Sequence, residues 1–289
     1  MVYENGDAYL SAERKCVTLF GMSGLGKTTV AATLRANGDW FHYSIDYRIG
    51  TRYMDEHIAD NFKIAAMQVP FLRELLMSDS IRISSNLSFN NLAPLSTYLG
   101  KPGDLRKGGI EFAEYQRRQG LHRTAEISAT IDTVHFIDRA RQVYGYPHFL
   151  CDTSGSLCEI VDPHDPEDPV LSAIVPHIAL VQIRGTDSDT EELVRRFDRA
   201  PKPMYYPPDF LTESWQGYLA ETGLAPDKVD PDDFIRWGFR RLIGHRVPRY
   251  GAIADKWGVA ISAEDVARLQ SGADFDALIA AALDARAGT

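Results

Sequence analysis

The sequence predicts an α/β fold in which a parallel β-sheet is covered by helices on both faces. Short apolar, β-prone runs alternate along the 289 residues with longer helix-forming stretches, which is the order that a parallel sheet requires. Hydrophobic residues make up 44% and charged residues 25%, so the chain has the composition of an ordinary folded domain with a full core. Ligands of such sheets bind beyond the carboxyl ends of the strands, so residues that follow a strand are the first candidates for a site.

Five apolar runs are the predicted strands. They are rich in β-branched and aromatic residues, and they lie at 15–20, 40–45, 148–152, 177–183 and 258–261. Asp46 follows the second run and Asp152 ends the third. Both acids are therefore expected at the carboxyl edge of the sheet.

Helices are expected between and after these strands. Helix-forming stretches lie at 27–37, 53–78, 111–143, 188–198, 231–243, 247–257 and 275–286. Pro70 divides the second stretch into two helices, because proline lacks an amide hydrogen and clashes with the preceding turn. Residues 79–110 are rich in Ser, Asn, Pro and Gly and predict loop with short helices, and 162–169 predict a turn-rich surface segment.

A glycine-rich segment joins the first strand to the first helix. Its sequence is Gly21-Met22-Ser23-Gly24-Leu25-Gly26-Lys27-Thr28-Thr29, which matches the phosphate-binding pattern GxxxxGK[ST] in its strand–turn–helix context. The glycines let the turn, residues 21–26 and here called the glycine loop, fold around phosphates, while loop amides and the helix N-terminus supply positive potential. We expect Lys27 to reach the β- and γ-phosphates and Thr28 to ligate Mg²⁺. The predicted nucleotide-binding residues are Gly21, Gly24, Leu25, Gly26, Lys27, Thr28 and Thr29.

This loop alone does not define an activity, because kinases, GTPases and motor ATPases share it. The chain has no [NT]KxD guanine signature, so ATP with Mg²⁺ is the expected cofactor pair. The alternative is a chance match to the pattern. We consider it weak, because the strand before the loop and the helix after it match what phosphate binding needs.

Charge and cysteine content exclude several other functions. Lys plus Arg total 31 and Asp plus Glu total 40, a net charge of −9, which argues against broad binding of nucleic acid. No apolar run is long enough to span a membrane, and the N-terminus lacks the apolar core of a signal peptide. Cys16, Cys151 and Cys158 show neither disulfide nor metal spacing, so a reducing cytoplasm is the expected compartment. Cys16 and Cys151 lie in apolar, strand-like runs, so we expect their thiols to be buried.

Six stretches, in order, resemble the shikimate kinase-like group of P-loop small-molecule kinases. They are the glycine-rich segment 21–29, Ser44-Ile45-Asp46-Tyr47-Arg48-Ile49, His122-Arg123-Thr124-Ala125-Glu126, Asp152-Thr153-Ser154-Gly155-Ser156, Val194-Arg195-Arg196-Phe197-Asp198-Arg199-Ala200-Pro201 and Arg246-Val247-Pro248-Arg249-Tyr250. The resemblance implies one P-loop NTPase domain over residues 1–289, with a helical and loop insertion at 51–110 after the second strand. A second insertion lies in the lid region at about 200–245.

The resemblance also implies roles for individual residues. Asp46 would bind or deprotonate the acceptor hydroxyl, and Arg199 of the lid would contact ATP phosphates, so Lys27, Asp46 and Arg199 are the predicted catalytic residues. The predicted acceptor-binding residues are Asp46, Arg123, Ser154, Gly155, Ser156 and Arg246. Thr28 and Asp152 are the predicted metal ligands.

Two departures from the family pattern stand out. Ser44 occupies the position of a family aspartate that helps to hold Mg²⁺, which leaves Asp152 as the leading acid for the metal. Ser154 and Ser156 replace two glycines of the family's acceptor loop. The simpler alternatives are also open: Asp46 or Asp152 as turn caps, and Arg123, Arg199 or Arg246 as solvated surface charges.

The leading hypothesis is therefore an ATP-dependent kinase that transfers the γ-phosphoryl group to a hydroxyl of a small, anionic molecule. An ATPase or nucleotide-dependent switch acting on a protein partner is the alternative, with the 51–110 insertion as a docking surface. A nucleotide-binding module without catalytic activity is a third hypothesis. No nucleic-acid or membrane partner is expected, and the sequence does not indicate the oligomeric state.

Overall fold

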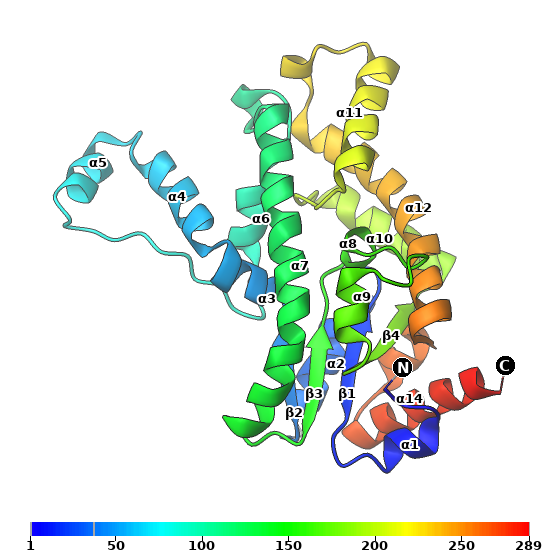
Figure 1. Ribbon diagram of the computed structural model, residues 1–289. Helices are drawn as coiled ribbons and strands as arrows, with labels where there is room; N and C mark the ends of the chain where they lie inside the picture. The colour runs from blue at the N-terminus through cyan, green and yellow to red at the C-terminus, as the bar shows by residue number, and fades with distance from the viewer. Residues whose placement is uncertain (1, 37, 289) are drawn as a thin grey trace. The chain divides into compact units, whose positions relative to one another are not determined.

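Five parallel strands form the sheet of this α/β protein in the computed structural model, which describes residues 2–36 and 38–288 (Figure 1). The strands are β1 Cys16–Phe20, β2 Trp40–Ser44, β3 His148–Asp152, β4 Ala179–Arg184 and β5 Val259–Ser262. All five predicted strands are confirmed, with small shifts at their ends. Ile45, predicted as the last residue of the second strand, instead begins the short helix α3 (Ile45–Arg48).

The strand order is β2-β3-β1-β4-β5. Strand β1 lies between β3 and β4, so the chain runs to one side of β1 through β2 and β3 and then crosses to the other side. Register places Asp152 opposite both Leu19 of β1 and Ser44 of β2. The carboxyl ends of β1, β2 and β3 therefore lie together at a topological switch point, where open α/β sheets bind ligands.

The contacts of the chain divide it into two compact units. The first comprises Met1–Ile45, Glu126–Ala200 and Gly238–Thr289, and the second comprises Asp46–Ala125 and Pro201–Trp237. The whole sheet belongs to the first unit. The second unit holds the predicted insertion at 51–110 and most of the insertion at about 200–245.

The first unit also contains the helices α1 Gly6–Leu10, α2 Lys27–Ala36, α8 Leu157–Ile160, α9 Pro169–Ile174, α10 Asp187–Arg199, α13 Ala263–Arg268 and α14 Gly272–Ala287. Helices α2, α13 and α14 contact strands of the sheet, and α1 contacts α14. Val30 and Leu34 of α2 are four residues apart, as are Phe275 and Ile279 of α14, so each pair lies on one helical face. All four pack with Val17 and Leu19 in one buried cluster.

The second unit is helical. Its elements are the π-helix η1 Ile49–Tyr53, α4 Asp55–Ala66, α5 Pro70–Met77, α6 Ala93–Leu99, the 3₁₀ helix η2 Leu105–Lys107, α11 Pro208–Thr222 and the 3₁₀ helix η3 Pro226–Lys228. Aromatic rings form part of its core: Trp215 lies 4.7 Å from Phe112 and 4.9 Å from Phe234 between ring centroids. Pro70 begins α5, so the predicted break between two helices at 53–78 is confirmed. Helix α11 was not predicted.

Two long helices, α7 Phe112–Gln142 and α12 Pro231–Trp257, contribute residues to both units. The prediction of separate helices at 231–243 and 247–257 is wrong, because α12 continues through Pro248. A proline inside a helix costs roughly 3 kcal/mol. The side chains of Ile243, Arg246, Tyr250 and Ile253 recur every three or four residues on one buried face, and their packing offsets that cost.

Within the described ranges, no helix combines the length and the apolarity that crossing a bilayer requires.

Candidate functional site

The glycine loop has a backbone that its sequence explains. Gly21, Gly24 and Gly26 have φ angles of 132°, 90° and 101°, which other residues rarely adopt. Gly21 is also close to β4, because a Cβ there would lie 2.6 Å from the carbonyl oxygen of Ile183. The loop therefore needs glycine at these positions for conformation, and at Gly21 for space as well.

Helix α2 begins directly after the loop with Lys27. The Lys27 side chain is folded back over the loop: its Nζ donates to the carbonyl oxygens of Gly21 at 2.8 Å and Met22 at 3.1 Å. Lys27 is only 6% exposed, so its charge is held at the loop by main-chain dipoles. The neighbouring Thr28 is exposed.

Asp152 at the end of β3 lies next to this helix start. Thr28 Oγ1 donates a hydrogen bond of 3.2 Å to Asp152 Oδ2, and His42 Nε2 of β2 lies 3.8 Å from the same oxygen. Asp152 is 7% exposed, and Ser44 lies opposite it in the sheet. The two predicted metal ligands are thus brought together, 124 residues apart in sequence.

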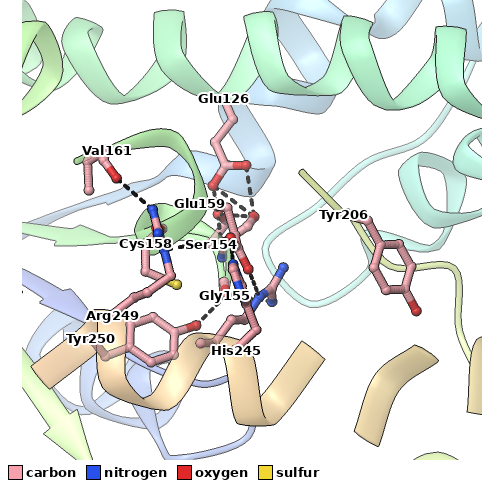
Figure 2. A network of polar contacts seen from close by, with 12 residues as sticks. Glu126, Ser154, Gly155, Cys158, Glu159, Val161, Tyr206, His245, Arg249 and Tyr250 are labelled. Atoms are coloured by element: carbon pink, nitrogen blue, oxygen red, sulfur yellow. Dashed lines mark hydrogen bonds and ion pairs between the residues drawn. The ribbon is translucent and has the colours of Figure 1, made fainter. Parts of the chain in front are cut away.

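A further segment, residues 153–156 and here called the serine loop, follows β3. Thr153, the first residue of the serine loop, is bonded to β1. Its amide and its hydroxyl both donate to the Leu19 carbonyl, at 3.1 and 3.0 Å. Ser154 and Ser156 are buried, and both donate to the carboxylate of Glu126 on α7. Figure 2 shows Ser154 next to this carboxylate. The Ser156 distances to the two carboxylate oxygens are 2.9 and 2.8 Å. The serine hydroxyls thus have an internal partner, and their assignment to an acceptor stays a prediction.

Helix α12 holds the same segment from another side. Arg246 is 5% exposed; its Nε donates to Glu159 Oε1 at 2.9 Å and its Nη1 to the Gly155 carbonyl at 2.7 Å. The Tyr250 hydroxyl donates to that same carbonyl, and His245 Nε2 lies 3.2 Å from Glu159 Oε2 (Figure 2). Arg246, predicted to bind an acceptor, is therefore engaged inside the protein.

Burial and charge decide the ionisation of this cluster. Burial lowers the pKa of the Arg246 guanidinium, but the negative charge around it, to which the Glu159 carboxylate contributes, more than offsets this and raises the pKa above its ordinary value. Burial raises the pKa of the Tyr250 hydroxyl well above its usual range, so this hydroxyl stays protonated and donates. The Glu159 side chain is 1% exposed and is paired with Arg246, as a buried carboxylate must be.

A cavity of about 380 Å³ adjoins the glycine loop. Most of its lining is apolar or small, and the residues are Gly24, Leu25, Gly26, Thr29, Val30, Thr33, Asp189, Ala263, Val266, Ala267 and Leu269. They come from the glycine loop, α2, α10, α13 and the residue after α13. The cavity therefore opens beside the helix start at which Lys27 and Thr28 lie.

The remaining predicted residues lie elsewhere. Arg199 is the last residue of α10 and is exposed. Asp46 of α3 and Arg123 of α7 are half-buried and belong to the second unit, so their roles stay predictions.

Sequence reasoning missed two residues of the first unit that the structure makes central. Glu159 follows β3 by seven residues in a stretch without a pattern, and no sequence signal identifies it. Glu126 is the last residue of the Arg123-x-x-Glu126 stretch that resembles the family motif, so the sequence does single it out. The motif by itself does not indicate that Glu126 binds Ser154 and Ser156.

Comparison of the chain with known family models, with curated proteins and with solved structures gives no match.

Proposed function

We propose that the protein is an ATP-dependent phosphotransferase that moves the γ-phosphoryl group to a hydroxyl of a small, anionic acceptor. The observation that carries this proposal is the hydrogen bond between Thr28 Oγ1 and Asp152 Oδ2, beside the glycine loop and Lys27. A loop with three glycines at positive φ, a lysine at the helix start and an acid on the adjacent strand are the parts that phosphoryl transfer uses.

The triphosphate would lie along the glycine loop. The backbone amides of such a turn attract anions. Helix α2 is ten residues long and begins at the loop, so the positive end of its dipole also lies there. Lys27 would exchange its carbonyl partners Gly21 and Met22 for phosphate oxygens, which bind an ammonium more strongly. The cavity of about 380 Å³ offers the nucleoside an apolar site next to the loop.

Thr28 and Asp152 fit a magnesium ion. Hydroxyl and carboxylate oxygens are the ligands that Mg²⁺ prefers, and its other positions are normally filled by phosphate and water. The described residues contain no cluster of three or more His, Cys, Asp or Glu that could form an all-protein metal site. When bound with ATP, the ion would supply positive charge that offsets the negative charge of the β- and γ-phosphates.

The acceptor class rests on the resemblance to shikimate kinase-like enzymes. Asp46 would orient or deprotonate the acceptor hydroxyl, and Arg123 would bind an anionic group. Arg199 would neutralise phosphate charge during transfer. These three roles are proposed from sequence alone.

A second candidate function is a nucleotide-dependent switch that acts on a protein partner. One feature of the second unit favours it: Ile64, Phe71 and Met77 of the 51–110 insertion are 66%, 67% and 74% exposed. A protein partner that covered these side chains would remove their apolar surface from water, which favours association.

One experiment separates the two functions. The protein is incubated with ATP and Mg²⁺, and ADP release is measured alone and with each member of a library of hydroxylated carboxylates and phosphates. A kinase releases ADP much faster with the correct acceptor than without it, and it forms a phosphorylated product. Steady acceptor-free hydrolysis would favour the switch, and failure of the wild-type protein to bind any nucleotide would exclude both.

A further inference from the structure

Gly155 of the serine loop lies in direct contact with the glycine loop. A Cβ atom at position 155 would lie 2.4 Å from Ser23 Oγ, far inside van der Waals contact, and 3.4 Å from the Ser23 amide nitrogen. The backbone of Gly155 does not have a positive φ, so the constraint on a larger residue here is the space beside the Ser23 side chain and not the backbone conformation. Ser23 itself lies between Gly21 and Gly24, inside the turn that would hold the phosphates.

The carbonyl of Gly155 is fixed by two buried side chains of α12. Arg246 Nη1 donates to it at 2.7 Å. The Tyr250 hydroxyl donates to it as well (Figure 2). These residues are four positions apart, so they project from the same face of the helix. Both are at most 5% exposed, which leaves neither side chain open to solvent.

The same helical face holds the chain that follows Gly155. Arg249 donates to the carbonyls of Cys158 at 2.7 Å and Val161 at 3.0 Å, while Glu159 accepts from Arg246. Residues 155–161 are therefore fastened to α12 at several points. A shift of this helical face would move Gly155, and Ser23 would have to accommodate that movement by rotating its side chain or by shifting the loop backbone.

From these contacts we infer that Arg246 and Tyr250 are positioning residues: through the Gly155 carbonyl they set the position of Ser23 and hence the shape of the glycine loop. This differs from the acceptor-binding role that the family resemblance implies for Arg246. The inference deepens the proposed function, because nucleotide affinity is one readout of loop shape. The loop's own mobility is a second readout that needs no nucleotide.

The first test is a double-variant cycle across the contact. In Gly155→Ala the new methyl group pushes on Ser23 Oγ, whereas in Gly155→Ala with Ser23→Ala that oxygen is gone and the nearest Ser23 atoms lie at 3.4 and 3.6 Å. Binding of a non-hydrolysable ATP analogue with Mg²⁺ is measured by calorimetry. Gly155→Ala should weaken binding about tenfold, and the double variant should return to the level of Ser23→Ala alone, since touching residues couple. Additive effects of the two substitutions would overturn the inference.

The second test compares two buried tyrosine hydroxyls that donate to main-chain carbonyls. Tyr250→Phe removes the bond to Gly155, and the matched control Tyr43→Phe removes a 2.8 Å bond to Ala129 of α7. Tyr250→Phe should weaken analogue binding about three- to tenfold, whereas Tyr43→Phe should leave the affinity within about twofold of wild type. Both substitutions are expected to lower the midpoint of thermal unfolding, so affinity and not stability distinguishes them. Arg246→Lys, which keeps the charge but loses the paired geometry, should behave like Tyr250→Phe. Equal effects of the two Phe variants on affinity would contradict the inference, as would an Arg246→Lys variant that alters only acceptor KM.

Hydrogen exchange separates this inference from the proposed function. Amide exchange of the peptide spanning the glycine loop is followed by mass spectrometry in the nucleotide-free protein. Gly155→Ala and Tyr250→Phe should speed exchange there, and adding Ser23→Ala to Gly155→Ala should restore it. If wild-type protein binds no nucleotide, the proposed function fails while this measurement still decides the inference; unchanged exchange in all variants would refute it.

Discussion

Thr28 and Asp152 are joined by a 3.2 Å hydrogen bond between their side-chain oxygens, although 124 residues separate them in sequence. The bond forms because β1, which leads into the glycine loop, and β3, which ends in Asp152, are neighbours in a parallel sheet. Their carboxyl ends consequently meet at one edge. A hydroxyl and a carboxylate that already face each other need little rearrangement to share one magnesium ion.

Replacement of both residues tests this relationship. Asp152→Asn and Thr28→Ala should each raise the Mg²⁺ concentration needed for tight binding of the ATP analogue, by about tenfold or more. The combined variant should lose less than the sum of the two changes in binding free energy, because in the proposed site both groups would serve the same ion. The measurement is an Mg²⁺ titration of analogue binding, with Asp255→Asn on the exposed part of α12 as a control. Full additivity would show that the two residues act independently.

Lys27→Ala should remove the charge that the proposed mechanism places on the β- and γ-phosphates. We expect acceptor-dependent ADP release to fall by at least about 100-fold, comparable to the loss of one preorganised charge-stabilising group elsewhere. Steady-state assays of product formation measure the change. Lys256→Ala, which removes an exposed lysine of the same unit, is the control and should keep wild-type activity. Retention of full activity in Lys27→Ala would refute the nucleotide site.

Asp46→Asn tests the acceptor role that the resemblance implies. The amide cannot take a proton from a hydroxyl, so kcat should fall by about 100-fold or more while the affinity for the ATP analogue stays within about twofold. Parallel measurement of kcat and analogue binding checks this split. Equal losses in both quantities would argue that Asp46 supports the fold or the nucleotide and does not act on the acceptor.

The three cysteines should be inert in the folded protein. Burial raises the pKa of Cys16 to about 11 and those of Cys151 and Cys158 to about 12, so at pH 8 each thiol is protonated and unreactive. A coloured disulfide reagent at pH 8 should therefore label no thiol in native protein and three thiols in concentrated denaturant. Rapid labelling of native protein by even one equivalent would contradict the burial of these side chains.

Local patterns predicted most of the sheet and the glycine loop. The strands are short, mostly apolar runs. The glycines at 21, 24 and 26 indicate a turn whose backbone adopts positive φ angles. Helix ends were harder to predict. The break at Pro70 is confirmed because Pro70 begins a helix, whereas Pro248 lies inside α12, where a buried face outweighs the missing hydrogen bond.

The sequence by itself determined the strands, the glycine loop and the residues that follow each strand, because these depend on neighbours along the chain. Only the tertiary structure decided which of those residues meet. It joined Thr28 to Asp152, directed Ser154 and Ser156 toward Glu126, and placed Arg246 inside the protein against Glu159 and Gly155. Such pairs are set by strand order and by the packing of α7 and α12, and the free energy of a buried charge depends on partners that lie tens of residues away.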